Sequence, residues 1–317
     1  MDTTNKMVPT YARDIIAQVR RVVVGKDSVL LWVLASILAR GHILLEDIPG
    51  VGKTTMALAF SKVLDLKYSR VQFTPDVLPS DVTGYSVPDP KGTGMIYQPG
   101  AVLCNLFLAD ELNRATSRTQ SALLEAMEEG QVTVDGVSHP LPQPFFVIAT
   151  QNPTGAAGTQ PLPDSQMDRF MLRLSLGYPD AKDELAMILG RQQSNPLQAL
   201  QPILDRNTLI QLQALVENTH AGEVVSRYAV DLIQATRTHP LLLRGASPRA
   251  TLALIALSKS MAQLRGRDYV LPEDIQEAFP RCIAHRVLLS PAAQAQDQSA
   301  EDVLRAIVSA VAPPKLR

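Results

Sequence analysis

The feature that most constrains the fold is a glycine-rich turn between an apolar run and a stretch of helix formers. The turn reads Gly50-Val51-Gly52-Lys53-Thr54-Thr55; it follows the run His42–Leu45 and opens the stretch Lys53–Leu64. Glycines let backbone N–H groups close around phosphate oxygens, and the positive end of a helix favours anions. The pattern predicts a phosphate-binding loop (P-loop) at the end of a strand.

The loop departs from the usual pattern G-x-x-x-x-G-K-[ST] at its first position, where Asp47 replaces glycine. Asp47 and Ile48 must then form a turn that glycine usually supplies. We expect Lys53 to reach the β- and γ-phosphates and Thr54 to bind Mg²⁺. The loop residues expected to contact nucleotide are Pro49, Gly50, Val51, Gly52, Lys53, Thr54 and Thr55.

Short strand-like runs alternate with helix-forming stretches through the first part of the chain. Most of the runs are nearly all apolar, as in strands buried on both faces of a parallel sheet. The alternation predicts an α/β domain over residues 1–185. The expected strands are His42–Leu45, Val71–Phe73, Leu106–Ala109, Phe145–Thr150 and Met171–Leu176, with helices at Lys53–Leu64 and Ser117–Glu129.

Two segments interrupt this alternation and read as hairpins. Residues 85–97 contain the turn Asp89-Pro90-Lys91-Gly92, and residues 131–141 contain Asp135-Gly136, a strong hairpin signal. Neither is needed to complete a nucleotide-binding sheet, so we expect both to project from it as insertions.

After Pro179 the pattern becomes helical, and no strand pattern of comparable length follows. We therefore predict a helical second domain over residues 190–317. The helices expected from Pro179 onward are Ala181–Arg191, Asn207–Asn218, Val224–Arg237, Ser247–Gln263, Pro272–Ala284 and Ala300–Val311.

Polar side chains at two strand ends complete the candidate site. Asp110 and Glu111 follow the run Leu106–Ala109, and Asn152 follows Phe145–Thr150. Ligands of open α/β folds bind at this edge of the sheet. Asp110 suits an outer-shell Mg²⁺ role and Glu111 suits polarising a water for attack on the γ-phosphate. Asn152 could hydrogen-bond that water or the γ-phosphate without adding charge.

Two arginines are candidates for contacts with phosphate. Arg169 precedes the last strand; it could form a structural ion pair or act as an arginine finger against transition-state charge. Arg249 lies in Ser247-Pro248-Arg249, where serine suits the N-cap and proline the first turn of a helix. A cation there opposes the helix dipole, which favours a functional reason such as holding a phosphate.

Composition narrows the function classes. The 317 residues carry 30 basic and 31 acidic side chains, a net charge of −1, so no basic excess indicates a general nucleic-acid binder. The longest largely apolar stretch, Val29–Ala39, is far shorter than the roughly 20 residues of a membrane span. We expect no membrane span and a cytoplasmic protein. The thiols and imidazoles are scattered singly and read as ordinary residues: Cys104, Cys282, His42, His139, His220, His239 and His285.

The order of these motifs resembles AAA+ ATPases, and more closely the MoxR family. The resemblance spans nearly the whole chain and implies a P-loop parallel-sheet domain with helices on both faces, plus a smaller all-helical lid. The segments that carry it are Leu44–Thr55, Val71–Gly84, Ala109–Val134, Ala149–Phe170 and Gly245–Ala250.

The resemblance also implies residue roles. The loop matches Walker A, Asp110 and Glu111 match Walker B, Asn152 matches sensor 1, Arg169 the arginine finger and Arg249 sensor 2. Val24 and Gly25 resemble the segment near adenine, and the two hairpins resemble the helix-2 and pre-sensor-1 insertions. Arg114 is a rival for the cation that acts on a neighbour's nucleotide, and whether Arg249 acts in its own subunit or on a neighbour is left open.

By resemblance, the chain is an ATP-hydrolysing chaperone that works with Mg²⁺ in a homo-oligomeric ring, expected to be hexameric. Such proteins remodel or mature a client, for example by metal or cofactor insertion, and often work with a von Willebrand factor A protein. One alternative is an AAA+ nucleic-acid motor, although residues 131–141 carry no lysine or arginine. Another is a monomeric P-loop kinase or switch, which leaves Asn152, Arg169 and the second domain unexplained.

Overall fold

A five-stranded parallel sheet forms the centre of the molecule in the computed structural model, which describes residues 6–92, 94–152, 162–193 and 195–315. The strand order is β2-β5-β8-β1-β9, so the strand before the P-loop lies between two others. The strands are β1 (His42–Glu46), β2 (Tyr68–Gln72), β5 (Leu106–Asp110), β8 (Phe146–Gln151) and β9 (Phe170–Leu174).

The edge strand β2 begins earlier than the expected Val71–Phe73. It pairs with β5 from Tyr68 to Gln72, and its side chains are half-buried or exposed. An edge strand can carry polar residues because only part of it faces the core. Apolar runs therefore located the central strands well and this strand poorly.

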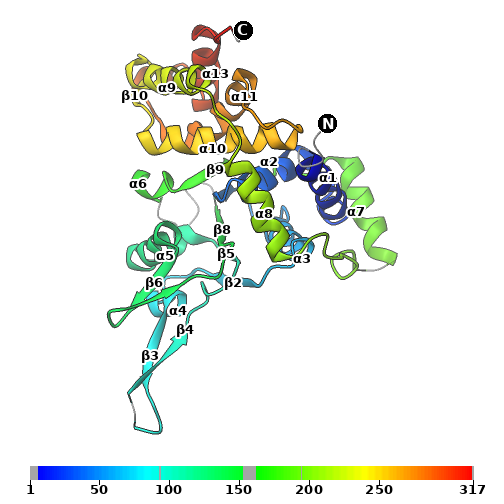
Figure 1. Cartoon of the computed structure of the whole chain (residues 1–317), viewed down its shortest axis with the longest axis vertical. Helices are drawn as coiled ribbons and strands as arrows, with labels where there is room; N and C mark the ends of the chain where they lie inside the picture. Colours follow the sequence, from blue (N-terminus) through cyan, green and yellow to red (C-terminus); the bar gives the residue numbers. More distant parts are fainter. Residues whose placement is uncertain (1–5, 93, 153–161, 194, 316–317) are drawn as a thin grey trace.

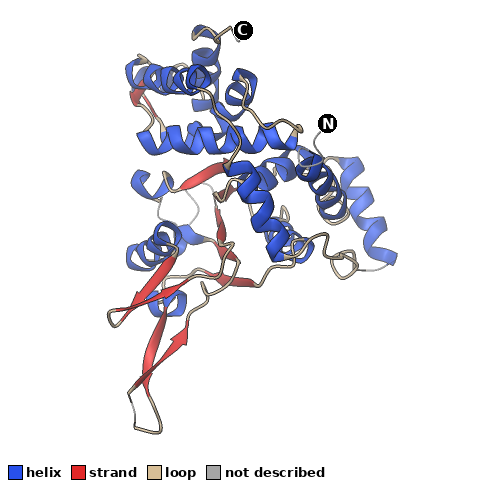
Figure 2. Cartoon of the chain, in the orientation of Figure 1, coloured by secondary structure: helices blue, strands red, loops and turns tan. Residues whose placement is uncertain are grey.

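Helices cover both faces of the sheet (Figures 1 and 2). Ile43 and Leu45 of β1 belong to one apolar core and Leu44 to the other, as strand alternation requires. The first core also contains α1 (Met7–Val19), α2 (Asp27–Leu38) and α3 (Lys53–Val63). The second is closed by α5 (Ser117–Glu129), with α4 (Pro79–Thr83) and α6 (Asp164–Met167) beside it.

The first core continues into the second domain without a break. Leu212 of α8 and Leu254 of α10 are fully buried in the same apolar cluster as α2. The helices after β9 are α7 (Ala181–Gln193), α8 (Arg206–Glu217), α9 (Glu223–Thr238), α10 (Pro248–Leu264), α11 (Pro272–Ile283), α12 (Pro291–Ala295) and α13 (Ala300–Ala310).

The second domain also holds one short antiparallel pair that the sequence did not indicate. It joins β10 (Leu242–Arg244) to β11 (Leu288–Leu289). Segments this short show no measurable alternation of apolar and polar residues. Their pairing therefore depends on the helices that bring them together.

Two antiparallel hairpins project from the end of the core that lies away from helices α9 to α13 (Figure 1). One joins β3 (Gly84–Pro88) to β4 (Met95–Pro99), and the other joins β6 (Gln131–Val134) to β7 (Val137–Pro140). They overlap the two expected insertions. Tyr97 of β4 stacks on His139 of β7, with ring centroids 3.7 Å apart and planes 11° from parallel.

Two expectations can be compared only with the residues that the structure describes. The segment Ala149–Phe170 is described except for residues 153–161, so the part of the expected resemblance that falls on residues 153–161 lies outside the structural account. Among the helices of the described ranges, none combines the length and apolar character needed to cross a membrane.

Candidate active site

The P-loop forms an open cradle between β1 and α3. Gly50 and Gly52 have φ angles of 87° and 95°, a left-handed backbone that side chains disfavour. A Cβ placed at either glycine would have no atom of the described residues within 4 Å apart from those of the glycine itself and its two chain neighbours. These two glycines are therefore needed for backbone conformation, and the space beside them is free for a ligand.

A hollow of about 320 Å³ lies against this cradle. It unites the ends of β1, β5 and β8, as the sheet order requires. The predicted residues that line it are Pro49, Gly50, Gly52, Lys53, Thr54, Thr55, Asp110, Glu111 and Asn152. Three further lining residues, Arg70, Gln72 and Thr150, were not predicted.

Lys53 is buried and held by the loop itself. Its Nζ donates hydrogen bonds to the carbonyl oxygens of Asp47, at 2.5 Å, and Ile48, at 3.3 Å. Burial lowers the pKa of Lys53 below its usual value, although neighbouring carboxylates act to raise it. The loop therefore holds the Lys53 ammonium group in position beside the hollow. Its two carbonyl partners are neutral, so phosphate oxygens can replace them.

Asp110 is held through both carboxylate oxygens. Thr150 donates to Oδ1 over 2.6 Å, while Thr54 donates to Oδ2 over 3.3 Å. Arg70 also binds Oδ2, with Nη2 at 2.7 Å. The Thr54 hydroxyl and the Asp110 carboxylate thus lie within hydrogen-bond distance of each other. This pair suits Mg²⁺, which usually binds only one or two protein oxygens and keeps water or phosphate oxygens as its other ligands. Thr54 and Asp110 could thus hold this ion.

Glu111 has an unusual backbone conformation next to Asp110. Its φ of 55° is left-handed, and such strain in a non-glycine residue is concentrated at functional sites. Its backbone N–H donates to the Thr150 hydroxyl over 2.9 Å. Asn152 donates to one carboxylate oxygen over 3.3 Å and Arg114 to the other over 2.9 Å. The carboxylate is thereby oriented at the edge of the hollow.

Asp47 is the residue that replaces the first P-loop glycine, and the structure gives a reason for it. Its buried carboxylate accepts hydrogen bonds from the N–H groups of Leu176, at 2.5 Å, and Gly177, at 3.1 Å. The Ser175 hydroxyl donates to it as well, over 2.8 Å. Asp47 therefore joins the P-loop to the chain that leaves β9 toward the second domain.

A smaller hollow of about 130 Å³ adjoins the cradle and shares Gly50, Gly52 and Thr55 with it. Val24 and Val51 contribute to its lining. Gly25 follows with a φ of 73°, and a Cβ there would lie 1.6 Å from a carboxylate oxygen of Asp183. That glycine is required both for its conformation and for the close approach of α7.

Arg169 and Arg249 do not line the P-loop hollow. Arg169 precedes β9 and lies near His42, at the end of β1 opposite to the P-loop. Both arginines bind Glu128 of α5: Arg169 through Nε at 2.9 Å, and Arg249 through Nη2. Partial burial acts to raise the pKa of Glu128, but hydrogen bonds and charge from both arginines outweigh it and hold that pKa below its usual value.

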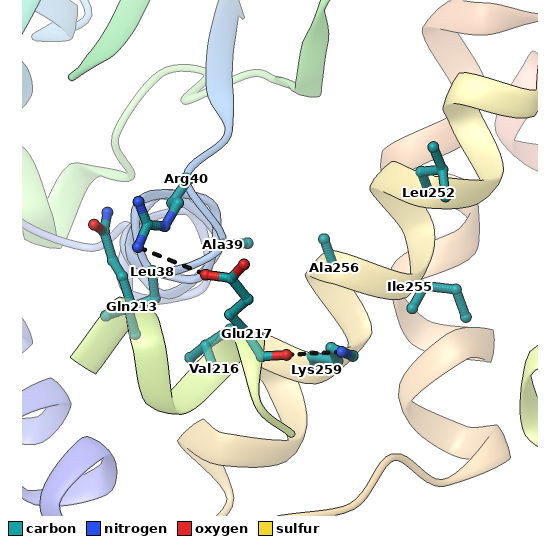
Figure 3. A pocket seen from close by; sticks show the side chains of 10 residues that line it. All are labelled: Leu38, Ala39, Arg40, Gln213, Val216, Glu217, Leu252, Ile255, Ala256 and Lys259. Carbon is teal, nitrogen blue, oxygen red and sulfur yellow. Dashed lines mark hydrogen bonds and ion pairs between the residues drawn. The ribbon is translucent and has the colours of Figure 1, made fainter. Parts of the chain in front are cut away.

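Another hollow lies between α2, α8 and α10, and its chemistry differs (Figure 3). Its charged lining residues contact one another: Arg40 forms an ion pair with Glu217 at 3.6 Å, and Lys259 donates to the Glu217 carbonyl over 2.8 Å. The remaining lining is mostly apolar and includes the exposed Leu252. Both cations that line this hollow are thus already engaged by the chain itself, which makes it a poor site for phosphate.

Comparison with known families agrees with this geometry. The model of the ATPase family associated with various cellular activities (AAA) matches residues 42–172. The model of the AAA lid domain matches residues 234–307. The first match runs from the start of β1 into β9, and the second runs from within α9 to within α13.

Individual relatives match nearly the whole chain. Uncharacterized protein YeaC of Bacillus subtilis is 46% identical over 95% of this chain and 94% of its own length. Chaperone MoxR1 of Mycobacterium tuberculosis is 39% identical over 95% of this chain and 82% of its own length. The crystal structure of a candidate ATPase from Cytophaga hutchinsonii superposes with a TM-score of 0.90 at 36% identity, covering 98% of this chain and 97% of that one.

Proposed function

Because this chain belongs to the MoxR family of AAA+ ATPases, we propose that it hydrolyses ATP to ADP and phosphate in the P-loop hollow. The observation that carries the proposal is the meeting of Lys53, Asp110 and Glu111 around one open cradle. Thr54 and Asp110 are the proposed holders of Mg²⁺, and bound Mg²⁺ would neutralise charge on the phosphate oxygens. Val24 and Gly25 are proposed to border the adenine.

The side chains divide the reaction between binding and proton transfer. Lys53 exchanges its two loop carbonyls for phosphate oxygens when nucleotide binds. Glu111 accepts a proton from the water that attacks the γ-phosphate. Asn152 orients that carboxylate through its hydrogen bond, so removing the amide should slow hydrolysis more than binding.

Arg169 and Arg249 are proposed to complete the site of a neighbouring copy. Their support is a shared position: both bind Glu128, and both are remote from their own P-loop at the opposite end of β1. Cations placed there can reach transition-state charge only across a contact between two chains. Arg114, in contrast, is paired with Glu111 of its own chain, which favours a local role.

The wider function we propose is that of a chaperone. A homo-oligomeric ring, expected to be hexameric, would couple ATP turnover to movements of the lid and the two hairpins in the cytoplasm. Such movements would remodel or mature a client protein, for example during metal or cofactor insertion, with a von Willebrand factor A protein as partner. The name of Chaperone MoxR1, a relative of similar length, supports this role.

Mixing two inactive variants tests the proposal. Glu111→Gln should lack hydrolysis but keep Arg169, while Arg169→Ala should keep Glu111 but lack the finger. In a mixed assembly, a site with Glu111 meets a neighbour with Arg169, so phosphate release should recover to a clear fraction of the wild-type rate.

The controls separate the parts of the proposal. Mixing Glu111→Gln with Lys53→Ala should restore nothing, because no chain in that mixture carries both Lys53 and Glu111. Recovery absent from the first mixture would exclude action between chains. Wild-type protein that ignores ATP at every protein concentration would overturn the ATPase assignment itself.

A further inference from the structure

Arg70 makes a close contact with the proposed Mg²⁺ ligand. It lies on the edge strand β2, and its side chain reaches Asp110 at the end of β5. Nε and Nη2 both donate to the same oxygen, Oδ2, over 3.1 and 2.7 Å. Two donors on one carboxylate oxygen make a strong, charge-assisted contact.

The oxygen that Arg70 binds is the one that faces the P-loop. Thr54 donates to the same Oδ2, whereas Thr150 holds Oδ1 on the far side of the carboxylate. The Arg70 guanidinium and a metal ion bound between Thr54 and Asp110 would both interact with the negative charge on Oδ2. The two cannot both neutralise Oδ2 fully, whether the ion binds it directly or through water.

The pair is not needed to hold β2 in the sheet. Five consecutive residues of β2 pair with β5 through the backbone, and the Phe73 N–H donates to the Asp110 carbonyl over 2.8 Å. The Arg70 side chain is 44% exposed, whereas that of Asp110 is 10% exposed. Arg70 can thus leave the carboxylate without opening the core.

Arg70 also contacts a second residue that lines the same hollow. Its Nη2 also donates to Gln72 over 2.9 Å, and both residues line the hollow beside the P-loop. Gln72 thus offers the guanidinium a partner within this hollow that does not depend on Asp110.

We propose that Arg70 is an exchangeable counter-ion of Asp110, which neutralises this carboxylate when Mg²⁺ is absent and leaves it when Mg²⁺ and nucleotide enter. The inference rests on the proposed ATP site and adds a positioning residue to it. Arg70 thus competes with the metal ion and keeps Asp110 in place until the ion arrives.

The test measures Mg²⁺ dependence of binding, not turnover. A fluorescent N-methylanthraniloyl-ADP is bound to the full chain in EDTA, and Mg²⁺ is then titrated in. Removing the competitor in Arg70→Gln should lower the half-saturating Mg²⁺ concentration about tenfold, the order expected for one charge-assisted contact. Arg70→Lys, which keeps the charge and loses the two-donor contact, should lower it by a smaller factor.

Arg305→Gln is the matched control, because it removes a guanidinium from an exposed pair with Asp302 in the lid. Its half-saturating Mg²⁺ concentration should equal that of the wild type. If Arg70→Gln binds the probe but its Mg²⁺ dependence is unchanged, or is shifted to higher concentration, the counter-ion role is wrong. If that variant does not fold, an unshifted Arg70→Lys would contradict the role in the same way. Wild-type protein that never binds the probe would instead overturn the proposed function.

Discussion

Asn152 donates a hydrogen bond from its side-chain amide to Oε1 of Glu111 over 3.3 Å, and this contact joins the end of β8 to the end of β5. Parallel neighbouring strands bring their carboxyl ends to one edge, so residues 41 positions apart meet there. The contact gives Glu111 a fixed orientation without neutralising its charge. That arrangement is suited to a base that must accept a proton.

Replacing Glu111 by glutamine should separate binding from hydrolysis. The amide keeps the size of the carboxylate and can still accept from Asn152, but it cannot take a proton. We expect nucleotide affinity to stay within a few-fold of wild type and phosphate release to fall by about 10²–10⁴-fold. The same exchange at the exposed Glu125 of α5 is the control and should change neither quantity. Undiminished turnover in Glu111→Gln would remove this residue from its role.

Restoring the usual P-loop glycine should weaken the fold. Asp47→Gly removes the acceptor of two N–H groups and one hydroxyl near Leu176, and the Leu176 N–H would stay buried without a partner. We expect the free energy of unfolding to fall by about 3 kcal/mol. Urea unfolding followed by circular dichroism measures this change.

Asp47→Asn serves as the comparison for that prediction. It keeps one acceptor oxygen and the side-chain shape, so its loss should be smaller than that of Asp47→Gly. Equal stability of the glycine variant and the wild type would show that water replaces the carboxylate without cost.

The parts of the site that the sequence reveals are those set by local patterns. Apolar runs located the central strands, and the side chains just after them, such as Asp110 and Asn152, had to share one edge of a parallel sheet. Gly50 and Gly52 could be assigned to a phosphate-binding loop because a glycine-rich turn that leads into a helix is typical of few other structures.

The remaining contacts depend on tertiary packing that local patterns do not encode. Arg70 lies on an edge strand with a weak pattern, and its partner is 40 positions away. Glu128 reads as one more charge on an exposed helix face, and Asp47 finds its partners about 129 positions later in the chain. None of these pairings has a sequence spacing that could have been recognised in advance.

The stacking of Tyr97 on His139 predicts that the two hairpins move together. His139→Ala removes one ring, and such stacked pairs contribute about 0.5–1.5 kcal/mol. We expect amide hydrogen exchange in both hairpins to become about fivefold faster, which corresponds to about 1 kcal/mol. Tyr97→Phe keeps the ring and removes only the hydroxyl that donates to the Thr83 carbonyl, so it should loosen residues near Thr83 and not the second hairpin. Faster exchange in one hairpin alone after His139→Ala would contradict the coupling.

His42 should make the fold sensitive to mild acid. Burial lowers its pKa to about 4, against an ordinary value of 6.5. The Val147 N–H donates to Nδ1 over 3.0 Å, so Nε2 carries the proton and donates to the Met127 carbonyl over 3.1 Å. A second proton has no place at Nδ1 unless the Val147 contact breaks.

The sign of the effect follows from where the proton binds. Below pH 6.5 the unfolded chain takes up a proton that the folded chain refuses until about pH 4, so stability is full above pH 6.5 and is lost as the pH falls. For His42 alone, the free energy of unfolding should drop by about 2 kcal/mol between pH 7 and pH 5, a range above the ordinary titration of carboxylates. Urea unfolding at the two pH values measures it.

His285, whose pKa burial also lowers, acts in the same direction and remains in a His42→Gln variant. That variant should therefore lose part of the pH dependence, and an unchanged difference between pH 7 and pH 5 would show that His42 is not its source.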